Sequence, residues 1–325
     1  PATIVGIPPQ EDAWLGKATE RIFLAPMKMT MVPEIVDMDM PVEGVFHNLV
    51  IAQIKKDYAG QGQKVMNAMW GAGQMMFNKI LVIADEQIKI QDYESLAKYV
   101  FANLDPSNDI YFSQGPMDVL DHSCSKLGFG GKMCIDGTTK MEEERDDHAA
   151  WSDVKNFSHD FVQNFPEITG INSQLLNKGI PVIVVAVKKN RKGHIRELHQ
   201  QLCETQAMEA VKMVLYVEHT VDPMDLGVAL WRFCNNLDPK RDSILVQRPS
   251  RTNVGKNFSC MGLDGTIKTK EFDNFQRDWP NIIVSDDATI KAVDAKWDKL
   301  GLGPFLPSPS LKFKGQVYGE DAVVH

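Results

Sequence analysis

The chain has 325 residues, a length typical of about two domains. Its 43% apolar and 24% charged residues are ordinary for a globular protein. The formal net charge of -8 argues against nucleic acid as a partner, and no apolar run approaches the roughly 20 residues that a membrane-spanning helix needs.

The cysteines indicate the redox compartment of the protein, and the first residues of the chain indicate how it is delimited. The five cysteines are odd in number and form no C-x-x-C pair, which favours a reduced, cytoplasmic protein. No signal-peptide pattern precedes them. Because the chain begins at Pro1, directly before the strand-like residues 3–6, we expect it to be a piece of a longer protein.

The first half of the chain alternates between predicted strands and helices. Continuous apolar runs are typical of buried strands, and apolar residues at helical spacing predict an amphipathic helix. Asp92 is the predicted N-cap of one of the helices. In chain order, these patterns predict a strand over 49–54, a helix over 62–76, a strand over 79–84, a helix from 92 to 103 and a strand over 110–112.

The second half repeats the first at a spacing of 133 residues. Pro33-Glu34-Ile35 recurs as Pro166-Glu167-Ile168, and Asn103-Leu104-Asp105-Pro106 recurs as Asn236-Leu237-Asp238-Pro239. After a shortening of five residues, Asp136-Gly137-Thr138 recurs as Asp264-Gly265-Thr266. The same elements are predicted again over 181–187, from 194, over 213–217, from 225 to 236 and over 244–246.

This repeat predicts an α/β fold of two tandem, duplicated domains. Strand–helix–strand units with short loops favour mainly parallel sheets with helices on their faces. We place the first copy at residues 1–148 and the second at 149–325. The second copy ends in a predicted helix over 286–300 and a proline-rich tail over 304–309, which we expect to pack on a neighbouring subunit of a homo-oligomer.

Several motifs have both a functional and a structural interpretation. The segment Gly128–Lys132 could cradle a phosphate, but it lacks a P-loop ending, and we interpret it as a turn. Asp118, Asp121 and His122 follow no known metal-ligand spacing, so capping or salt bridging is the better interpretation and no metal site is predicted. We expect His47 to be a surface histidine.

Residues that only one copy has are candidates for function. Lys64 becomes Glu197, Trp70 becomes Cys203 and Met117 becomes Ser250 in the second copy. A cation beside apolar and aromatic side chains suits an anionic aromatic ligand of the first copy. Drift on a surface helix is the other interpretation, and the copies alone leave both open.

The first copy, from Ile4 to Lys140, resembles the UbiD family of carboxy-lyases, the family of 3-polyprenyl-4-hydroxybenzoate decarboxylase. Several spaced motifs occur in the family's order. They are Pro33-Glu34-Ile35-Val36-Asp37, Ile54-Lys55-Lys56-x-Tyr58-Ala59-Gly60, Lys64-Val65-Met66 with Trp70, Asp105-Pro106-x-x-Asp109, Pro116-x-Asp118-x-Leu120-Asp121, and Gly131-Lys132-Met133-x-Ile135-Asp136. The second copy looks like a diverged duplicate of the same C-terminal domain.

The resemblance implies reversible, non-oxidative decarboxylation of aromatic or α,β-unsaturated acids. The implied cofactors are prenylated FMN, a divalent metal (Mn or Mg) and potassium, held mainly by the family's preceding region, which also carries its catalytic glutamates and metal ligands. By position, Lys64 would contact the cofactor phosphate, and Leu15, Trp70 and Met117 would line the substrate pocket. Many members have Thr-Arg near the potassium, where this chain has Ala102-Asn103.

No catalytic residue is therefore predicted in this chain, and the chain alone is expected to be inactive. The alternative function is a non-catalytic binding or oligomerisation module.

Overall fold

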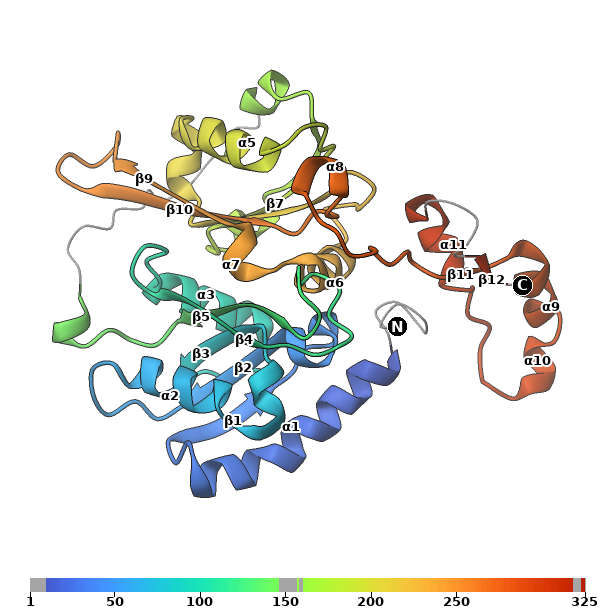
Figure 1. Cartoon of the computed structure of the whole chain (residues 1–325), viewed down its shortest axis with the longest axis horizontal. Helices are drawn as coiled ribbons and strands as arrows, with labels where there is room; N and C mark the ends of the chain where they lie inside the picture. Colours follow the sequence, from blue (N-terminus) through green and yellow to red (C-terminus); the bar gives the residue numbers. More distant parts are fainter. Residues whose placement is uncertain (1–9, 146–156, 158–159, 318–322, 325) are drawn as a thin grey trace.

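A computed structural model describes residues 10–145, 157, 160–317 and 323–324 (Figure 1). The strand-like start at residues 3–6 and the proposed domain boundary near residue 148 lie outside these residues, so the boundary stays a prediction. Within the described part of the chain, no helix is both long and apolar enough to cross a membrane.

The first copy is built on a five-stranded sheet with the order β1-β2-β3-β5-β4. The central strands β2, β3 and β5 run parallel, and the edge strands β1 and β4 pair antiparallel to their neighbours. Its strands are β1 (Ile35–Asp39), β2 (Leu49–Ile54), β3 (Ile80–Asp85), β4 (Ile110–Pro116) and β5 (Phe129–Asp136).

The second copy repeats this sheet with the order β6-β7-β8-β10-β9. Its strands are β6 (Ile168–Asn172), β7 (Val182–Val187), β8 (Met213–Glu218), β9 (Ser243–Pro249) and β10 (Asn257–Asp264). Even the local irregularity recurs, because a register shift at Ile35/Asp37 reappears at Ile168/Gly170. The predicted duplication is confirmed. Both sheets are mixed, because the edge strands β1, β4, β6 and β9 each pair antiparallel to the neighbouring strand.

Helices cover both faces of each sheet, as predicted. Asp92 and Asp225 cap α3 and α6 through their carboxylates, as predicted. The helix predicted over 62–76 ends at Trp70 and is followed by a 3-10 segment, Gly73–Phe77. The helices of the two domains are α1 (Gln10–Thr30), α2 (Gln61–Trp70), α3 (Tyr93–Asn103), α4 (Gln174–Asn177), α5 (His194–Cys203), α6 (Leu226–Asn236), α7 (Pro239–Asp242) and α8 (Lys270–Asp273).

The two copies pack face to face around one shared core. Along β2, Ile51 joins this shared core, whereas Val50 and Ala52 face the outer core of the first copy. In β7, Val184 faces the shared core and Val185 the outer core of the second copy. Because successive side chains of a strand point to opposite faces of the sheet, both faces of each sheet are buried in a core. Figure 1 shows the resulting layers, with α1 and α2 on one outside, α3 and α6 between the sheets, and α5 on the other outside.

The C-terminal segment forms an arm beside the second copy (Figure 1). The helix predicted over 286–300 is wrong in extent, because Lys296 N–H bonds Val293 O at 2.9 Å and tightens the chain into a turn. The arm's elements are β11 (Val284–Ser285), α9 (Asp287–Asp294), α10 (Trp297–Leu300), α11 (Ser310–Phe313) and β12 (Val323–Val324). Phe313 anchors the arm against Trp231 of α6, with ring centroids 5.9 Å apart.

Candidate functional site in the first copy

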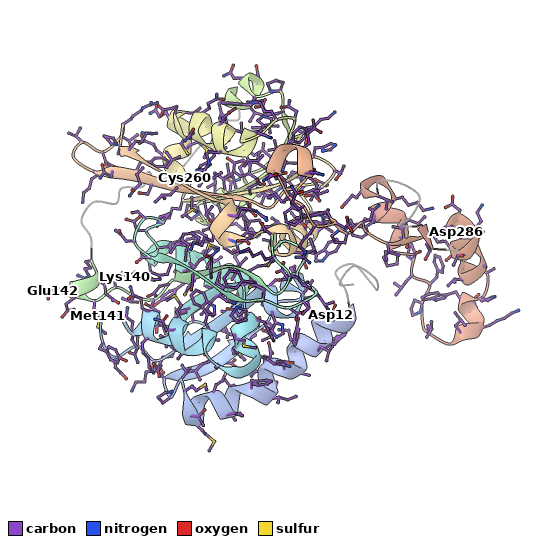
Figure 2. The ribbon with its side chains drawn as sticks, viewed as in Figure 1. Asp12, Lys140, Met141, Glu142, Cys260 and Asp286 are labelled. Atoms are coloured by element: carbon purple, nitrogen blue, oxygen red, sulfur yellow. The ribbon has the colours of Figure 1, made fainter. Side chains whose placement is uncertain are left out.

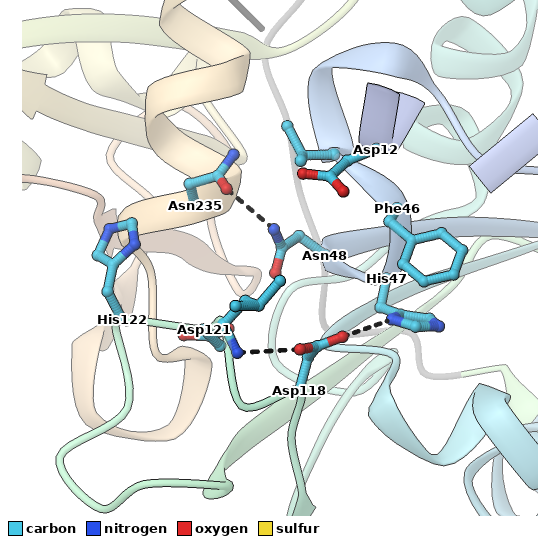
Figure 3. A pocket seen from close by; sticks show the side chains of 10 residues that line it. Asp12, Phe46, His47, Asn48, Asp118, Asp121, His122 and Asn235 are labelled. Carbon is cyan, nitrogen blue, oxygen red and sulfur yellow. Dashed lines mark hydrogen bonds and ion pairs between the residues drawn. The ribbon is translucent and has the colours of Figure 1, made fainter. Parts of the chain in front are cut away.

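A small cleft of about 40 Å³ lies where the first copy meets the end of α6 (Figure 3). It is bordered by the start of α1, the 3-10 segment Phe46–Asn48 and the loop that follows β4. Asn48 donates across the copies to Asn235 Oδ1 at 3.1 Å. The lining side chains are mostly polar: Asp12, Val45, Phe46, His47, Asn48, Asp118, Leu120, Asp121, His122 and Asn235.

The prediction of a surface position for His47 is wrong. Its ring is buried, and its Nδ1 lies 3.3 Å from Asp118 Oδ2. The hydrogen bond with His47 holds the pKa of Asp118 below its usual value despite partial burial. The internal repeat carried the signal for this burial, because the counterpart of His47 is Ile180, which is also buried.

Asp118, Asp121 and His122, whose residue types could suggest a metal site, each bind a different partner. Asp118 pairs with His47, Asp121 forms a fully buried ion pair with Lys79 at 2.8 Å, and His122 Nε2 lies 3.0 Å from Asn236 Oδ1. Burial alone raises the pKa of Asp121, but the Lys79 ammonium outweighs it and keeps that pKa well below its usual range. Asp118 and Asp121 therefore form charged pairs of the kind that the structural interpretation predicts.

The second copy holds the loop after β4 in place. Arg241 of the second copy donates to Ser123 O at 2.7 Å, and Arg277 donates to Cys124 O at 2.7 Å and to Asp121 O at 3.1 Å. Hydrogen bonds from charged donors are among the stronger ones in proteins. The position of the candidate site thus depends on side chains more than 100 residues away in sequence.

Met117 begins the same loop and is buried. Lys132, also buried, donates to Asn78 O at 2.8 Å and to Met117 Sδ at 3.5 Å. The segment Gly128–Lys132 was interpreted as a turn, but only Gly128, with a φ of +70°, has a turn conformation. The rest of the segment belongs to strand β5. Lys132, the lysine of this segment, makes its hydrogen bonds inside the fold.

Leu15 and Trp70 occupy different surroundings. Leu15 lies on α1 in a stripe with Trp14, Ile22 and Met29, whose side chains are between 49% and 84% exposed. Trp70 ends α2 and packs against the outer core of the first copy. Its indole Nε1 is buried and has no hydrogen-bond partner among the described residues.

Lys64 lies in a separate open hollow of about 550 Å³ that Lys28 and Lys55 also line. Its Nζ contacts both carboxylate oxygens of Glu34, at 2.6 and 2.7 Å, while its side chain stays 41% exposed. The structure therefore separates Lys64 from the cleft bordered by Asp118. The neighbouring cations Lys28 and Lys55 were missed because they are scattered along the sequence.

The acidic run Glu142–Glu144 proves partly structural rather than simply solvated. Glu144 accepts from Lys56 Nζ at 2.5 Å and from Gly60 N–H at 2.8 Å, at the start of α2. In the second copy Lys189 pairs with Asp273 in the same way, at 2.7 Å. Figure 2 shows Lys140, Met141 and Glu142 at the end of the first copy opposite to Asp12, so this network lies away from the cleft.

Comparison with known families decides where the chain belongs. The model of the 3-octaprenyl-4-hydroxybenzoate carboxy-lyase C-terminal domain, UbiD_C, matches residues 13–137 and again residues 155–264. The chain belongs to the UbiD family. Both copies of this UbiD domain are recognised, which agrees with the shared strand order.

Relatives of the UbiD chain occur in archaea and bacteria. An uncharacterized protein of Archaeoglobus fulgidus is 48% identical over 47% of the chain and 32% of its own length. One from Helicobacter pylori is 33% identical over 86% of the chain and 42% of its own length. The chain thus spans about a third to two fifths of the length of these relatives.

Among solved structures, the chain is similar to the UbiD-class enzyme HmfF from Pelotomaculum thermopropionicum in complex with FMN. The match has a TM-score of 0.37 and 20% identity, and it covers 49% of the chain and 35% of that enzyme. A likeness this partial carries no weight for the chemistry of the chain.

Proposed function

We propose that this chain is the C-terminal part of a UbiD-like enzyme that decarboxylates aromatic or α,β-unsaturated acids reversibly and without oxidation. Membership of the carboxy-lyase family across both copies supports the reaction class. The part of the relatives' length that the chain does not span leaves room for the family's catalytic glutamates and metal ligands. The five free thiols support the reducing, cytoplasmic setting that we propose.

The first copy supplies the face that meets the rest of the enzyme. The observation that carries this is the row of exposed apolar side chains Trp14, Leu15, Ile22 and Met29 along α1, a helix whose start borders the cleft. Large contiguous apolar patches mark binding surfaces. Leu15 would form part of the substrate wall itself, and the more buried Trp70 and Met117 would support that wall from beneath.

We assign no catalytic acid or base to this chain. Two of the carboxylates that line the cleft are occupied, because Asp118 pairs with His47 and Asp121 with Lys79. Proton transfer needs a positioned donor of matched pKa. We therefore expect the chain alone, supplied with prenylated FMN and a divalent metal, to release no carbon dioxide, and measurable release would overturn this assignment.

Lys64 is our candidate for the cofactor phosphate. Prenylated FMN would supply the electron sink for decarboxylation, while the protein supplies binding and orientation. The hollow offers Lys28, Lys55 and Lys64 to a phosphate, and Glu34, Asp57 and Glu86 line it as well. A bound phosphate would therefore displace Glu34 from the Lys64 ammonium. We place the metal and potassium sites in the preceding part of the enzyme.

The test compares Lys64→Ala with Glu197→Ala in the full-length enzyme. A charge-assisted hydrogen bond to phosphate contributes about 1.5–3 kcal/mol, or roughly one to two decades in affinity. Lys64→Ala should therefore lower bound flavin per chain after gel filtration. Glu197→Ala, at the matching position of the second copy, should leave it unchanged. Equal losses in both variants, or none in either, would contradict the proposal.

We further propose that the arm joins subunits into a homo-oligomer, which develops the oligomerisation alternative. Its surface exposes several large apolar side chains outside both cores: Leu300, Leu302, Phe305, Leu306 and Leu311. Replacing Phe305 and Leu306 by Asp should lower the mass measured by light scattering. Replacing Leu245, an exposed leucine of β9, should not. An unchanged mass in the arm variant would sink this idea.

A further inference from the structure

The second copy contains a cluster of metal-ligand side chains that the first copy lacks. His199 and Cys203 stand one turn apart on the inward side of α5, and Cys260 lies opposite them on β10. All three are fully buried, and their ligand atoms lie within 4.8 Å of one another. Figure 2 shows Cys260 inside the second copy. We propose that these three residues bind a zinc ion.

The imidazole is oriented as a ligand. His199 Nδ1 lies 2.9 Å from the hydroxyl of the buried Tyr216, and Nε2 lies 3.7 Å from Cys203 Sγ. Metal-binding histidines usually donate their other ring N–H to a fixed acceptor, which sets the tautomer and the ring plane. Tyr216 takes this supporting position. Nε2 lies 3.7 Å from Cys203 Sγ and 3.3 Å from the main-chain oxygen of Cys260, so a bound ion would replace that second contact.

The spacing and the donor set suit zinc. With Zn–S near 2.3 Å and Zn–N near 2.05 Å, a sulfur and a nitrogen on a tetrahedral ion stand about 3.6 Å apart. The 3.7 Å between Cys203 Sγ and His199 Nε2 agrees with this value. Two thiolates and a neutral imidazole bring the charge of a bound zinc site to zero, which lowers the cost of burying the ion. The cluster supplies three of the four ligands that a tetrahedral zinc ion takes.

The copy comparison shows that the fold does not require this cluster. Matching positions lie 133 residues apart before the shortening and 128 apart after it. His199, Cys203 and Tyr216 therefore match Met66, Trp70 and Ile83 of the first copy, and Cys260 matches Lys132. Both copies nevertheless build the same helix and strands. The three proposed ligands and the supporting Tyr216 therefore all differ from the residues at the matching positions of the first copy.

A glycine makes the room for the imidazole. A Cβ atom at Gly262 would come within 2.7 Å of His199 Cγ and Nδ1, a distance that requires the ring to move. The matching residue of the first copy is Cys134, which faces the apolar outer core there. Gly262 is thus a further difference that serves the placement of His199.

The charged group nearest to the cluster is compatible with an ion. Arg248 Nε donates to Cys203 O at 2.9 Å, and its Nη1 is paired with Glu209 at 2.8 Å. Two nitrogens of the guanidinium are therefore turned toward a carbonyl and a carboxylate, while Nη2 is buried without a hydrogen-bond partner among the described residues. Bound zinc would tie α5 to β10 and hold the outer face of the second copy together.

The test measures metal in the whole chain, purified without an affinity tag and dialysed. We expect about one zinc per chain by mass spectrometry, and below about 0.2 in Cys203→Ser and in His199→Met, which restores the first-copy residue. Cys134→Ser, which also places a hydroxyl in a sheet core, is the matched control and should keep its zinc. Loss in the control equal to that in the cluster variants would overturn the site.

Two readouts on the unmutated chain do not depend on any variant folding. Cobalt added to metal-free protein should give the visible absorption bands of a tetrahedral cobalt–thiolate site, and zinc should abolish them. Thiol titration in denaturant, after anaerobic purification, should find all five cysteines reduced. Three reactive thiols would indicate a disulfide between Cys203 and Cys260, and that result or the absence of cobalt bands would refute the zinc site.

Discussion

The two copies share strand order, register and even a bulge, yet they use matching buried positions differently. Lys79 of the first copy pairs with the carboxylate of Asp121. Its counterpart Lys212 donates to the main-chain oxygens of Phe101 and Leu104, at the end of α3 across the interface. Both copies thus keep a buried lysine at this place, but its partners differ.

The outer helices differ in the same manner. In the first copy Lys64 of α2 is paired with Glu34, whereas the second copy has Glu197 at that position, paired with Arg191 at 3.0 Å. The charge is reversed but remains compensated. We therefore propose a function for a difference between the copies only where it also lies at a hollow or builds a cluster, as at Lys64 and at His199.

The strongest test of the comparison is Asp121→Ala. It leaves the Lys79 ammonium buried without its carboxylate, and breaking a buried pair costs about 3–5 kcal/mol. Urea denaturation should show this loss in the free energy of unfolding. The double variant Lys79→Met with Asp121→Ala should recover part of it. A loss below about 1 kcal/mol would mean that Lys79, like Lys212, does not depend on a carboxylate partner.

The pH dependence of stability tests His122, which lies in the loop after β4. Burial lowers the pKa of His122 to about 4, below its ordinary 6.5, so the unfolded chain binds a proton that the folded chain does not between these values. Stability should fall as the pH drops from 6.5 to 4, by on the order of 2 kcal/mol, since the ring is only partly enclosed. His122→Gln should flatten this slope. His219→Gln, at an exposed histidine of the second copy, should not change it.

The support that the second copy gives to the loop can be measured with Arg277→Ala. This variant removes hydrogen bonds to Asp121 O and Cys124 O, and each orphaned carbonyl costs about 1–3 kcal/mol. We expect faster hydrogen exchange over residues 118–125 and a lower urea midpoint. Unchanged exchange in this loop would show that the first copy holds it alone.

The smallest effect is expected from Arg191→Ala. Its ion pair with Glu197 is about half exposed on both sides, and such surface pairs contribute about 0–1 kcal/mol. The urea midpoint should shift by little more than the error of measurement. A loss above about 2 kcal/mol would mean that the reversed charge of the second copy is structurally important.

The sequence by itself determined the architecture of this protein. Strands, helix caps such as Asp92 and Asp225, and the repeat are local patterns, so they predicted two α/β domains of one topology. The repeat could also have shown that His47 is buried, because its counterpart is Ile180. Lys64 remains a prediction that the structure places in an open hollow without testing its role.

Only the tertiary structure decided which distant side chains meet. Lys79 and Asp121 are 42 residues apart, Cys203 and Cys260 are 57 apart, and Arg277 reaches a loop more than 150 residues before it. Such pairs leave no periodic trace in the sequence, because the packing of sheet on helix and of copy on copy brings them together. The antiparallel pairing of β4 with β5 was likewise decided by hydrogen bonds that form only in the folded sheet.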